Sequence, residues 1–204
     1  MSLIPIQQTR LLERFLRYVR VDTTANPAST TYPSSLGQLA LGKILLDELK
    51  GMGLRAEQDE HGLVMATIPA TNSAPSPVIA FNAHLDTSPE TSGANIHPQV
   101  HSPYSGGDIV LPGDPTKVIR TAENPELGAL IGKTIITSDG TTLLGADDKA
   151  GVAVIMELAA TLVENPGIPH GEIRLLFTCD EEIGHGVDHV NFEKLAAHVA
   201  YTLD

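Results

Sequence analysis

Four short motifs with acidic or imidazole side chains could do chemistry. They are His84-Leu85-Asp86, Gly145-Ala146-Asp147-Asp148-Lys149, Asp180-Glu181-Glu182 and the final residue, Asp204. Zinc in enzymes is bound by imidazole nitrogens and carboxylate oxygens, and a pair of ions about 3.5–4 Å apart requires a carboxylate that can touch both. These residue types indicate a hydrolytic site with a pair of metal ions, and we expect that one more ligand is missing.

The first motif has the spacing of a supported metal ligand. In an extended segment residues i and i+2 share a face, so Asp86 can lie beside the imidazole of His84. A carboxylate that accepts the free ring N–H fixes the tautomer and raises the basicity of the ligand. For an isolated His-x-Asp motif, a strand-end histidine with a surface aspartate is the commoner interpretation, but the other motifs favour the metal role.

The two remaining acidic pairs each have an ordinary alternative. Asp147 and Asp148 come directly before an expected helix, where carboxylates usually cap the helix end, and Asp148 can be only that. A carboxylate at a tight Gly-Ala turn can also bridge two cations. Glu181 and Glu182 are too close together to flank a glycosidic bond, which needs carboxylates about 5–10 Å apart. One of them can bind metal while the other acts as a general base, or the pair can be a solvated acidic turn.

The elements that must position these residues follow from hydrophobic periodicity. Helices are predicted over residues 7–19, from after Ser35 to Gly51 or Gly53, and over 149–164; a hairpin is predicted over 55–59 and 63–68, and strands over 78–83, 134–136, 172–178 and 199–203. Strands that alternate with helices favour an α/β fold with a mostly parallel sheet flanked by helices, in which ligands bind at the carboxyl ends of strands. We expect all four motifs at such ends.

Between residues 87 and 133 the sequence loses its periodicity and gathers Pro, Gly, Ser and Asn. We expect a long loop here, and loops of this length inside a compact domain are usually lids or binding loops.

Composition excludes several classes of function. The chain has 204 residues, 42% of them hydrophobic, which leaves room for one substantial core and a lobe. No apolar window approaches the roughly 20 residues of a membrane span, and residues 1–7 lack a basic and a long apolar segment, so we predict no membrane partner and a cytoplasmic location. Cys179 is the only cysteine, which excludes an internal disulfide. A net charge of −12 argues against a nucleic-acid partner and leaves a small substrate.

The motifs, taken in order, resemble a metallopeptidase family that comprises zinc-dependent aminoacylases, carboxypeptidases and di- and tripeptidases. The resemblance extends from the first helix to the last residue. Four segments carry the resemblance: His84-Leu85-Asp86-Thr87-Ser88-Pro89, Tyr104-Ser105-Gly106-Gly107-Asp108-Ile109, Leu143-Leu144-Gly145-Ala146-Asp147-Asp148-Lys149-Ala150-Gly151 and Ala200-Tyr201-Thr202-Leu203-Asp204. Within this family the segment Ser105-Gly106-Gly107-Asp108 favours the tripeptide aminopeptidases.

The resemblance implies a role for each site residue. His84, Asp147 and Asp204 would hold one Zn²⁺, and Asp147 would bridge to a second Zn²⁺ held by Glu182. The catalytic residues would be Asp86, which orients His84, and Glu181, which accepts the proton of the attacking water. The resemblance also implies a cis peptide bond between Asp147 and Asp148, and a histidine ligand for the second ion that lies far downstream in the family and is absent here.

Family members are much longer than this chain. Residues 1–204 would therefore be the N-terminal portion of a truncated zinc-peptidase catalytic domain, without the dimerisation domain and the C-terminal catalytic segment. The full-length form would be a homodimer, with a zinc pair in each subunit, that removes the N-terminal residue of tripeptides, whereas this chain alone would be inactive. The alternatives are a related di-zinc deacylase or dipeptidase, and an inactive metal-binding fragment.

Overall fold

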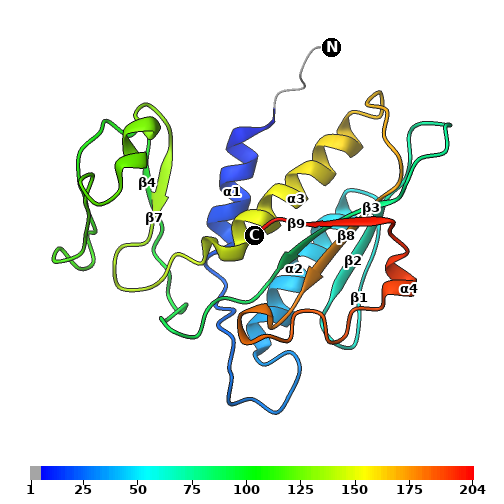
Figure 1. Cartoon of the computed structure of the whole chain (residues 1–204), viewed down its shortest axis with the longest axis horizontal. Coiled ribbons are helices and arrows are strands. Elements are labelled where there is room, and N and C mark those ends of the chain that lie inside the picture. Colours follow the sequence, from blue (N-terminus) through cyan, green and yellow to red (C-terminus); the bar gives the residue numbers. More distant parts are fainter. Residues whose placement is uncertain (1–5) are drawn as a thin grey trace.

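A five-stranded sheet in the order β1-β2-β8-β3-β9 is the centre of the fold in the computed structural model, which describes residues 6–204 (Figure 1). Neighbouring strands are antiparallel in the β1–β2 hairpin and between β2 and β8, and parallel between β8, β3 and β9. Strands β1, β8, β3 and β9 therefore point one way and β2 the other, which confirms the predicted α/β fold. The strands are β1 (Arg55–Gln58), β2 (Val64–Ile68), β3 (Ile79–His84), β8 (Ile173–Thr178) and β9 (Val199–Thr202).

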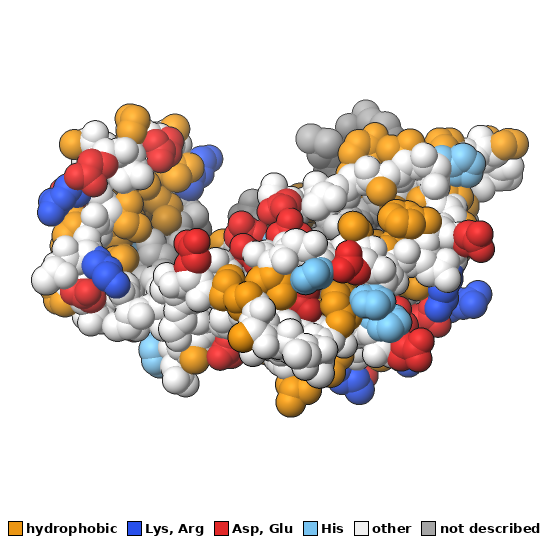
Figure 2. Space-filling model, turned by 60° about the horizontal axis from the view of Figure 1, so that its bottom comes forward, with side chains coloured by type: hydrophobic (Ala, Val, Ile, Leu, Met, Phe, Trp, Pro, Cys, Tyr) orange, Lys and Arg blue, Asp and Glu red, His pale blue; other side chains and the backbone are white. Residues whose placement is uncertain are grey.

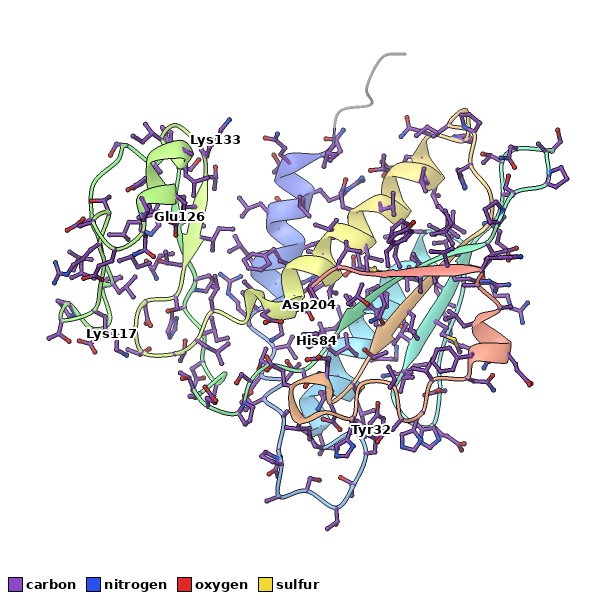
Figure 3. The ribbon with its side chains drawn as sticks, in the orientation of Figure 1. Tyr32, His84, Lys117, Glu126, Lys133 and Asp204 are labelled. Atoms are coloured by element: carbon purple, nitrogen blue, oxygen red, sulfur yellow. The ribbon has the colours of Figure 1, made fainter. Side chains whose placement is uncertain are left out.

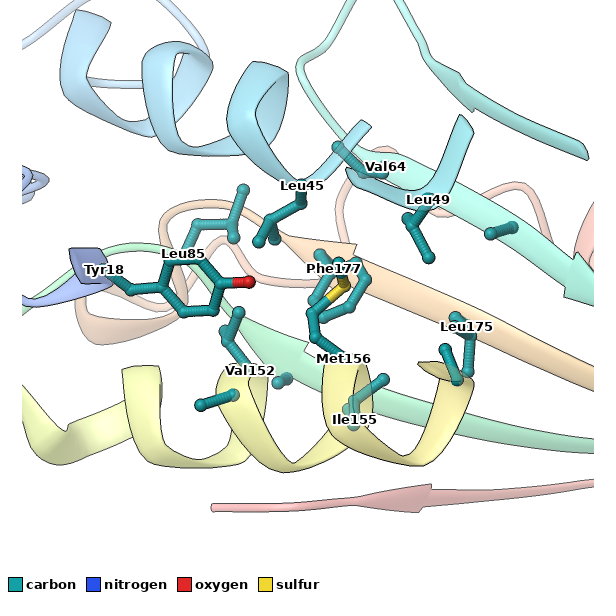
Figure 4. Close-up of a cluster of buried hydrophobic side chains, with 14 of the residues drawn as sticks. Tyr18, Leu45, Leu49, Val64, Leu85, Val152, Ile155, Met156, Leu175 and Phe177 are labelled. Carbon is teal, nitrogen blue, oxygen red and sulfur yellow. The ribbon is translucent and has the colours of Figure 1, made fainter. Parts of the chain in front are cut away.

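Two long helices, α2 (Leu36–Gly51) and α3 (Ala146–Glu164), pack against one face of this sheet, and a third, α1 (Gln8–Tyr18), packs against α3. All three are close to the predicted ranges. Alternate residues of β8 face α2 and α3, and Leu175 and Phe177 are fully buried against Leu45 of α2 and Met156 of α3 (Figure 4). Full burial of one such side chain stabilises the fold by about 1.5–3 kcal/mol, so this shared core fixes the helices to the sheet.

The opposite face of the sheet has a smaller cover. A short helix, α4 (Phe192–Leu195), which the sequence did not predict, lies on this side with a cluster formed by Leu63, Ala80, Leu176 and Leu195. Strand β9 forms the edge of the sheet, and its residues are exposed. The core of the described residues is therefore concentrated on the helical side.

The segment predicted as a long loop instead folds into a small lobe, drawn in green in Figure 1. The lobe has its own core, formed by Tyr104, Ile109, Leu111 and Leu127. Strands this short show no periodicity in a sequence, so the prediction of an irregular loop was wrong. The lobe contains β4 (Gln99–His101) paired with β7 (Ile135–Thr137), β5 (Ile109–Val110) paired with β6 (Val118–Ile119), and the 3-10 helix η1 (Pro125–Leu130).

Two further predictions concern the ends and the membrane. Residues 1–5, on which the prediction about the start of the chain depended, lie outside the described residues. In the part of the chain that the structure describes, no helix is both long enough and apolar enough to span a membrane.

Candidate metal centre

Three of the four predicted metal ligands meet at one edge of the sheet. Among residues 6–204, ligand atoms of His84, Asp147 and Asp204 all lie within 4.8 Å of one another. The Nε2 atom of His84 is 2.9 Å from Oδ1 of Asp147 and 3.9 Å from Oδ1 of Asp204. The imidazole is buried, whereas the side chains of Asp147 and Asp204 are 68% and 43% exposed. A cation at this place would sit between a buried nitrogen and two carboxylates that solvent can reach.

Parallel pairing of β3 and β9 explains how His84 and Asp204 come together. His84 is the last residue of β3, and Asp204 follows the end of β9 at Thr202. Because the two strands are parallel neighbours, their carboxyl ends lie at the same edge. Figure 3 shows both side chains beside the first turn of α3. The predicted placement of these two residues is confirmed.

Asp147 reaches the same place by a different route from the one predicted. The strand that precedes it, β7, belongs to the two-stranded sheet of the small lobe, so Asp147 does not follow a strand of the central sheet. It lies in the first turn of α3, directly after Gly145 and Ala146. Gly145 has a φ of +70°, which favours glycine, and a Cβ atom there would lie 3.1 Å from Thr87. The Asp147–Asp148 peptide bond is cis, as predicted.

Asp86 connects the imidazole to the acidic turn. Its buried carboxylate lies 3.3 Å from Nδ1 of His84, and its backbone carbonyl lies 3.1 Å from the same nitrogen. The two carboxylate oxygens also accept the backbone N–H groups of Glu181 and Glu182, each at 3.0 Å. The spacing of the sequence predicts the first contact, but the contacts with the acidic turn join segments 95 and 96 residues apart and had no sequence signal.

The two glutamates of the acidic turn occupy different positions. They start the 3-10 helix η2 (Glu181–Ile183), directly after β8 and Asp180. Oε2 of Glu181 is 3.9 Å from Nε2 of His84. Glu182 is not part of the group formed by His84, Asp147 and Asp204, so this predicted ligand does not share a metal position with all three of them. Burial raises the pKa of Glu182, and the nearby charge of Asp147 raises it further.

Asp148 has the capping role that was the alternative for this residue. It is buried, and its two oxygens accept the backbone N–H groups of His84 and Gly151, both at 3.1 Å. Burial raises its pKa to about 7, against the lowering effect of the His84 charge and of these two hydrogen bonds. Asp148 thus joins the start of α3 to the end of β3.

The site has the charge and donor chemistry of a divalent cation site. Burial alone would lower the pKa of His84. The hydrogen bond to Asp86 and the charge of Asp86 act against it, together with the charge of Asp148 and the hydrogen bond to Asp147, and the pKa is raised to about 9. Carboxylates that favour a proton on an imidazole also favour a cation there, since a metal binds the neutral ring in place of the proton. Figure 2 shows acidic side chains gathered at the hollow between the small lobe and the rest of the molecule. One nitrogen with carboxylate oxygens fits a divalent metal such as zinc.

Other residues noted in the sequence lie outside this group. Cys179 is buried, and burial raises the pKa of its thiol, which agrees with a structural role. His101 lies on β4 in the small lobe, with Nε2 3.2 Å from the hydroxyl of Thr137.

The chain is similar in sequence and in structure to known peptidases. The sequence model of peptidase family M20/M25/M40 matches residues 139–201. Peptidase T of Halothermothrix orenii is 48% identical over 196 residues, which are 96% of this chain and 48% of that protein. Peptidase T of Listeria innocua is 50% identical over 195 residues, 95% of this chain and 48% of that protein. The chain therefore spans about half the length of the curated relatives that it matches.

A solved structure shows the same arrangement. The crystal structure of aminopeptidase PepT from Bacillus cereus ATCC 10987 matches with a TM-score of 0.67 and 29% identity, covering 98% of this chain and 44% of that one. The mixed α/β sheet with its flanking helices is thus the fold of this group of peptidases.

Proposed function

We propose that this chain, a homologue of the Peptidase T proteins, forms the metal-binding part of a zinc-dependent aminopeptidase that removes the N-terminal residue of tripeptides. The observation that carries the proposal is the meeting of His84, Asp147 and Asp204 within 4.8 Å, in a chain 48–50% identical to Peptidase T over nearly its whole length. A divalent metal suits the donor atoms, and zinc is the metal that we propose.

Each protein ligand has a proposed place. His84, Asp147 and Asp204 would hold one zinc ion, and Asp147, whose side chain is largely exposed, would bridge to a second ion held by Glu182. A histidine outside this chain would complete the second position. When bound, a zinc pair polarises the substrate carbonyl and lowers the pKa of water.

The reaction assigns distinct tasks to this chain's own residues. Asp86 holds the ring of His84 in one tautomer and orientation, because its carboxylate and carbonyl both face Nδ1. Glu181, which is half-exposed and 3.9 Å from His84, accepts a proton from the attacking water. As the C–O bond forms and the C–N bond breaks, Glu181 gives that proton to the departing amine.

The extent of the match limits what this chain does alone. Since it spans about half of its relatives, we propose that it is the N-terminal portion of the catalytic domain and that the remaining ligand, the dimerisation domain and part of the substrate site lie elsewhere. The 204-residue chain alone would then bind zinc weakly and hydrolyse tripeptides negligibly. The homodimer and the cytoplasmic location stay predictions from the sequence.

A chimera tests the proposal. In it this chain would replace the matching residues of Listeria innocua Peptidase T, and release of the N-terminal residue would be measured with tripeptides, dipeptides and N-acyl amino acids. We expect zinc-dependent cleavage of tripeptides, and none from a matched Asp147→Asn chimera. Preference for dipeptides or N-acyl substrates would replace the proposed activity by the dipeptidase or deacylase alternative. A folded chimera that binds no zinc would refute the metal site itself.

A further inference from the structure

Asp180, which has no place in the proposed chemistry, is the most tightly held residue of the acidic turn. It directly precedes Glu181, its side chain is 1% exposed, and its φ of +59° is left-handed. Its carboxylate accepts the backbone N–H of Ser34 at 2.6 Å, and it also accepts the hydroxyl of Ser34. A non-glycine residue in this conformation is uncommon, and here buried hydrogen bonds hold it in place.

Gln38 forms a reciprocal pair with Asp180. This residue lies in the first turn of α2 and is fully buried. Its Nε2 donates to Oδ1 of Asp180 at 2.6 Å, while its Oε1 accepts the backbone N–H of Asp180 at 3.0 Å. Because both a donor and an acceptor are fixed, the pair sets the position and the rotation of the Asp180 peptide relative to α2.

The loop before α2 adds a third contact. The hydroxyl of Tyr32 donates to the carbonyl of Cys179 at 3.0 Å, and Figure 3 shows Tyr32 below the turn that follows β8. Residues 32–38 therefore hold the main chain at residues 179 and 180, whereas Asp86 holds the next two N–H groups. The turn also closes on itself, since the N–H of His185 donates to the carbonyl of Asp180 at 2.8 Å.

These contacts tie the turn to two different elements. Asp86 anchors it to the end of β3, next to the metal ligands, and Asp180 anchors it to α2. One anchor would leave the turn free to rotate about it. With two, the positions of the Glu181 and Glu182 backbones relative to His84 are fixed before any metal binds.

We propose that Asp180 and Gln38 are positioning residues for the metal centre, acting through the backbone of the acidic turn on Glu181 and Glu182. This inference rests on the proposed function. It adds that α2 is required to position Glu182 at the second metal ion. Loss of a residue that orients a metal ligand usually lowers metal affinity about 10- to 100-fold, so the effect is large enough to measure.

The test exchanges the two partners in the Listeria innocua chimera, in which the second metal position is complete. Gln38→Glu places a second carboxylate against Asp180, and Asp180→Asn removes one acceptor. The double variant Gln38→Glu/Asp180→Asn restores an amide facing a carboxylate with the roles exchanged. Gln8→Glu, on the exposed start of α1, adds the same charge away from the site and is the matched control. Cobalt(II) is the probe, because its visible absorption reports the number and geometry of its ligands.

We expect Gln38→Glu to lower cobalt affinity about 10- to 100-fold and to change the absorption spectrum, the double variant to regain part of that affinity, and Gln8→Glu to match the wild type. The unfolding midpoint of each metal-free chimera is measured on the same samples. If Gln38→Glu does not fold, the double variant is compared with Asp180→Asn alone. The double variant should then bind cobalt more tightly than Asp180→Asn, because the exchanged pair is restored.

Three results would overturn the inference. They are wild-type affinity and spectrum in folded Gln38→Glu, a double variant no better than the weaker single variant, and a lower unfolding midpoint with unchanged affinity, which would make the pair merely structural. A folded wild-type chimera that binds no cobalt would refute the proposed metal site and this inference together. Wild-type binding with no tripeptidase activity in the chimera would refute only the proposed function.

Discussion

The carboxylate of Asp86 lies 3.3 Å from the imidazole of His84, and both side chains are almost completely buried. A buried ion in this position is stable only with its partners, and Asp86 has three, because it also accepts two backbone N–H groups of the acidic turn. The His84–Asp86 pair therefore links the imidazole of the candidate metal centre to the glutamates of the turn.

Asp86→Asn should weaken metal binding about 10- to 100-fold, because the amide holds the ring less firmly and offers one acceptor in place of two. Zinc affinity measured by competition with a chelator checks this. Asp188→Asn is the control, since that carboxylate pairs with His185 at the surface. Equal affinities in Asp86→Asn and the wild type would contradict the role of Asp86.

The metal-free chain should lose stability between pH 6.5 and 9. The pKa of His84 is raised to about 9, so the folded state holds the proton more tightly than the unfolded state. This stabilisation is complete below about pH 6.5 and is lost as the pH rises through 9, with a slope of up to about 1.4 kcal/mol per pH unit. Denaturant unfolding with a chelator present measures it.

The decisive quantity is the difference in the free energy of unfolding between the wild type and His84→Gln. Burial lowers the pKa of Lys149 to about 8, and this group acts in the opposite direction at higher pH in both proteins. We expect the free energies of unfolding of the two proteins to converge as the pH rises. A constant difference from pH 6.5 to 9 would mean that His84 does not titrate as described.

The two glutamates of the turn should separate into a base and a ligand. In the Listeria innocua chimera, Glu181→Gln should keep its zinc and lose activity by about 10²- to 10⁴-fold, because a general base usually contributes this much. Glu182→Gln should lose zinc. Activity and metal content, measured on the same samples, distinguish the two, and parallel loss of metal in both variants would show that the roles are assigned wrongly.

The pairing of α1 with α3 predicts an effect on stability away from the metal centre. Glu157 is buried and pairs with Arg14 and with Arg10, the latter at 2.8 Å. Glu157→Gln leaves the buried Arg14 with Glu48 as its remaining partner, and we expect a loss of about 3 kcal/mol in the free energy of unfolding.

Urea unfolding at neutral pH measures this loss, with Glu164→Gln as the control. Glu164 also pairs with Arg10 but is 51% exposed, so its change should be below about 1 kcal/mol. Similar values for the two variants would mean that burial does not control the strength of these pairs.

Local patterns in the sequence predicted the long elements and the ends of the sheet strands. His84 and Asp204 were placed correctly because strand ends at one sheet edge follow from topology. The route of Asp147 was wrong, since no local pattern shows that β7 pairs with β4 and not with the central sheet. The contacts of Asp180 with Gln38 span 142 residues, and such pairs depend on tertiary packing.

The small lobe has one more consequence, which concerns how this chain can diverge. Its ends enter and leave side by side, because Gln99 of β4 pairs with Thr137 of β7. A segment whose ends meet can be lengthened, shortened or exchanged as a cassette without moving the strands and helices that it interrupts. Natural selection can therefore change the length and sequence of residues 99–137 while His84, Asp147 and Asp204 keep their positions, so the lobe is the part of this chain that can vary most freely.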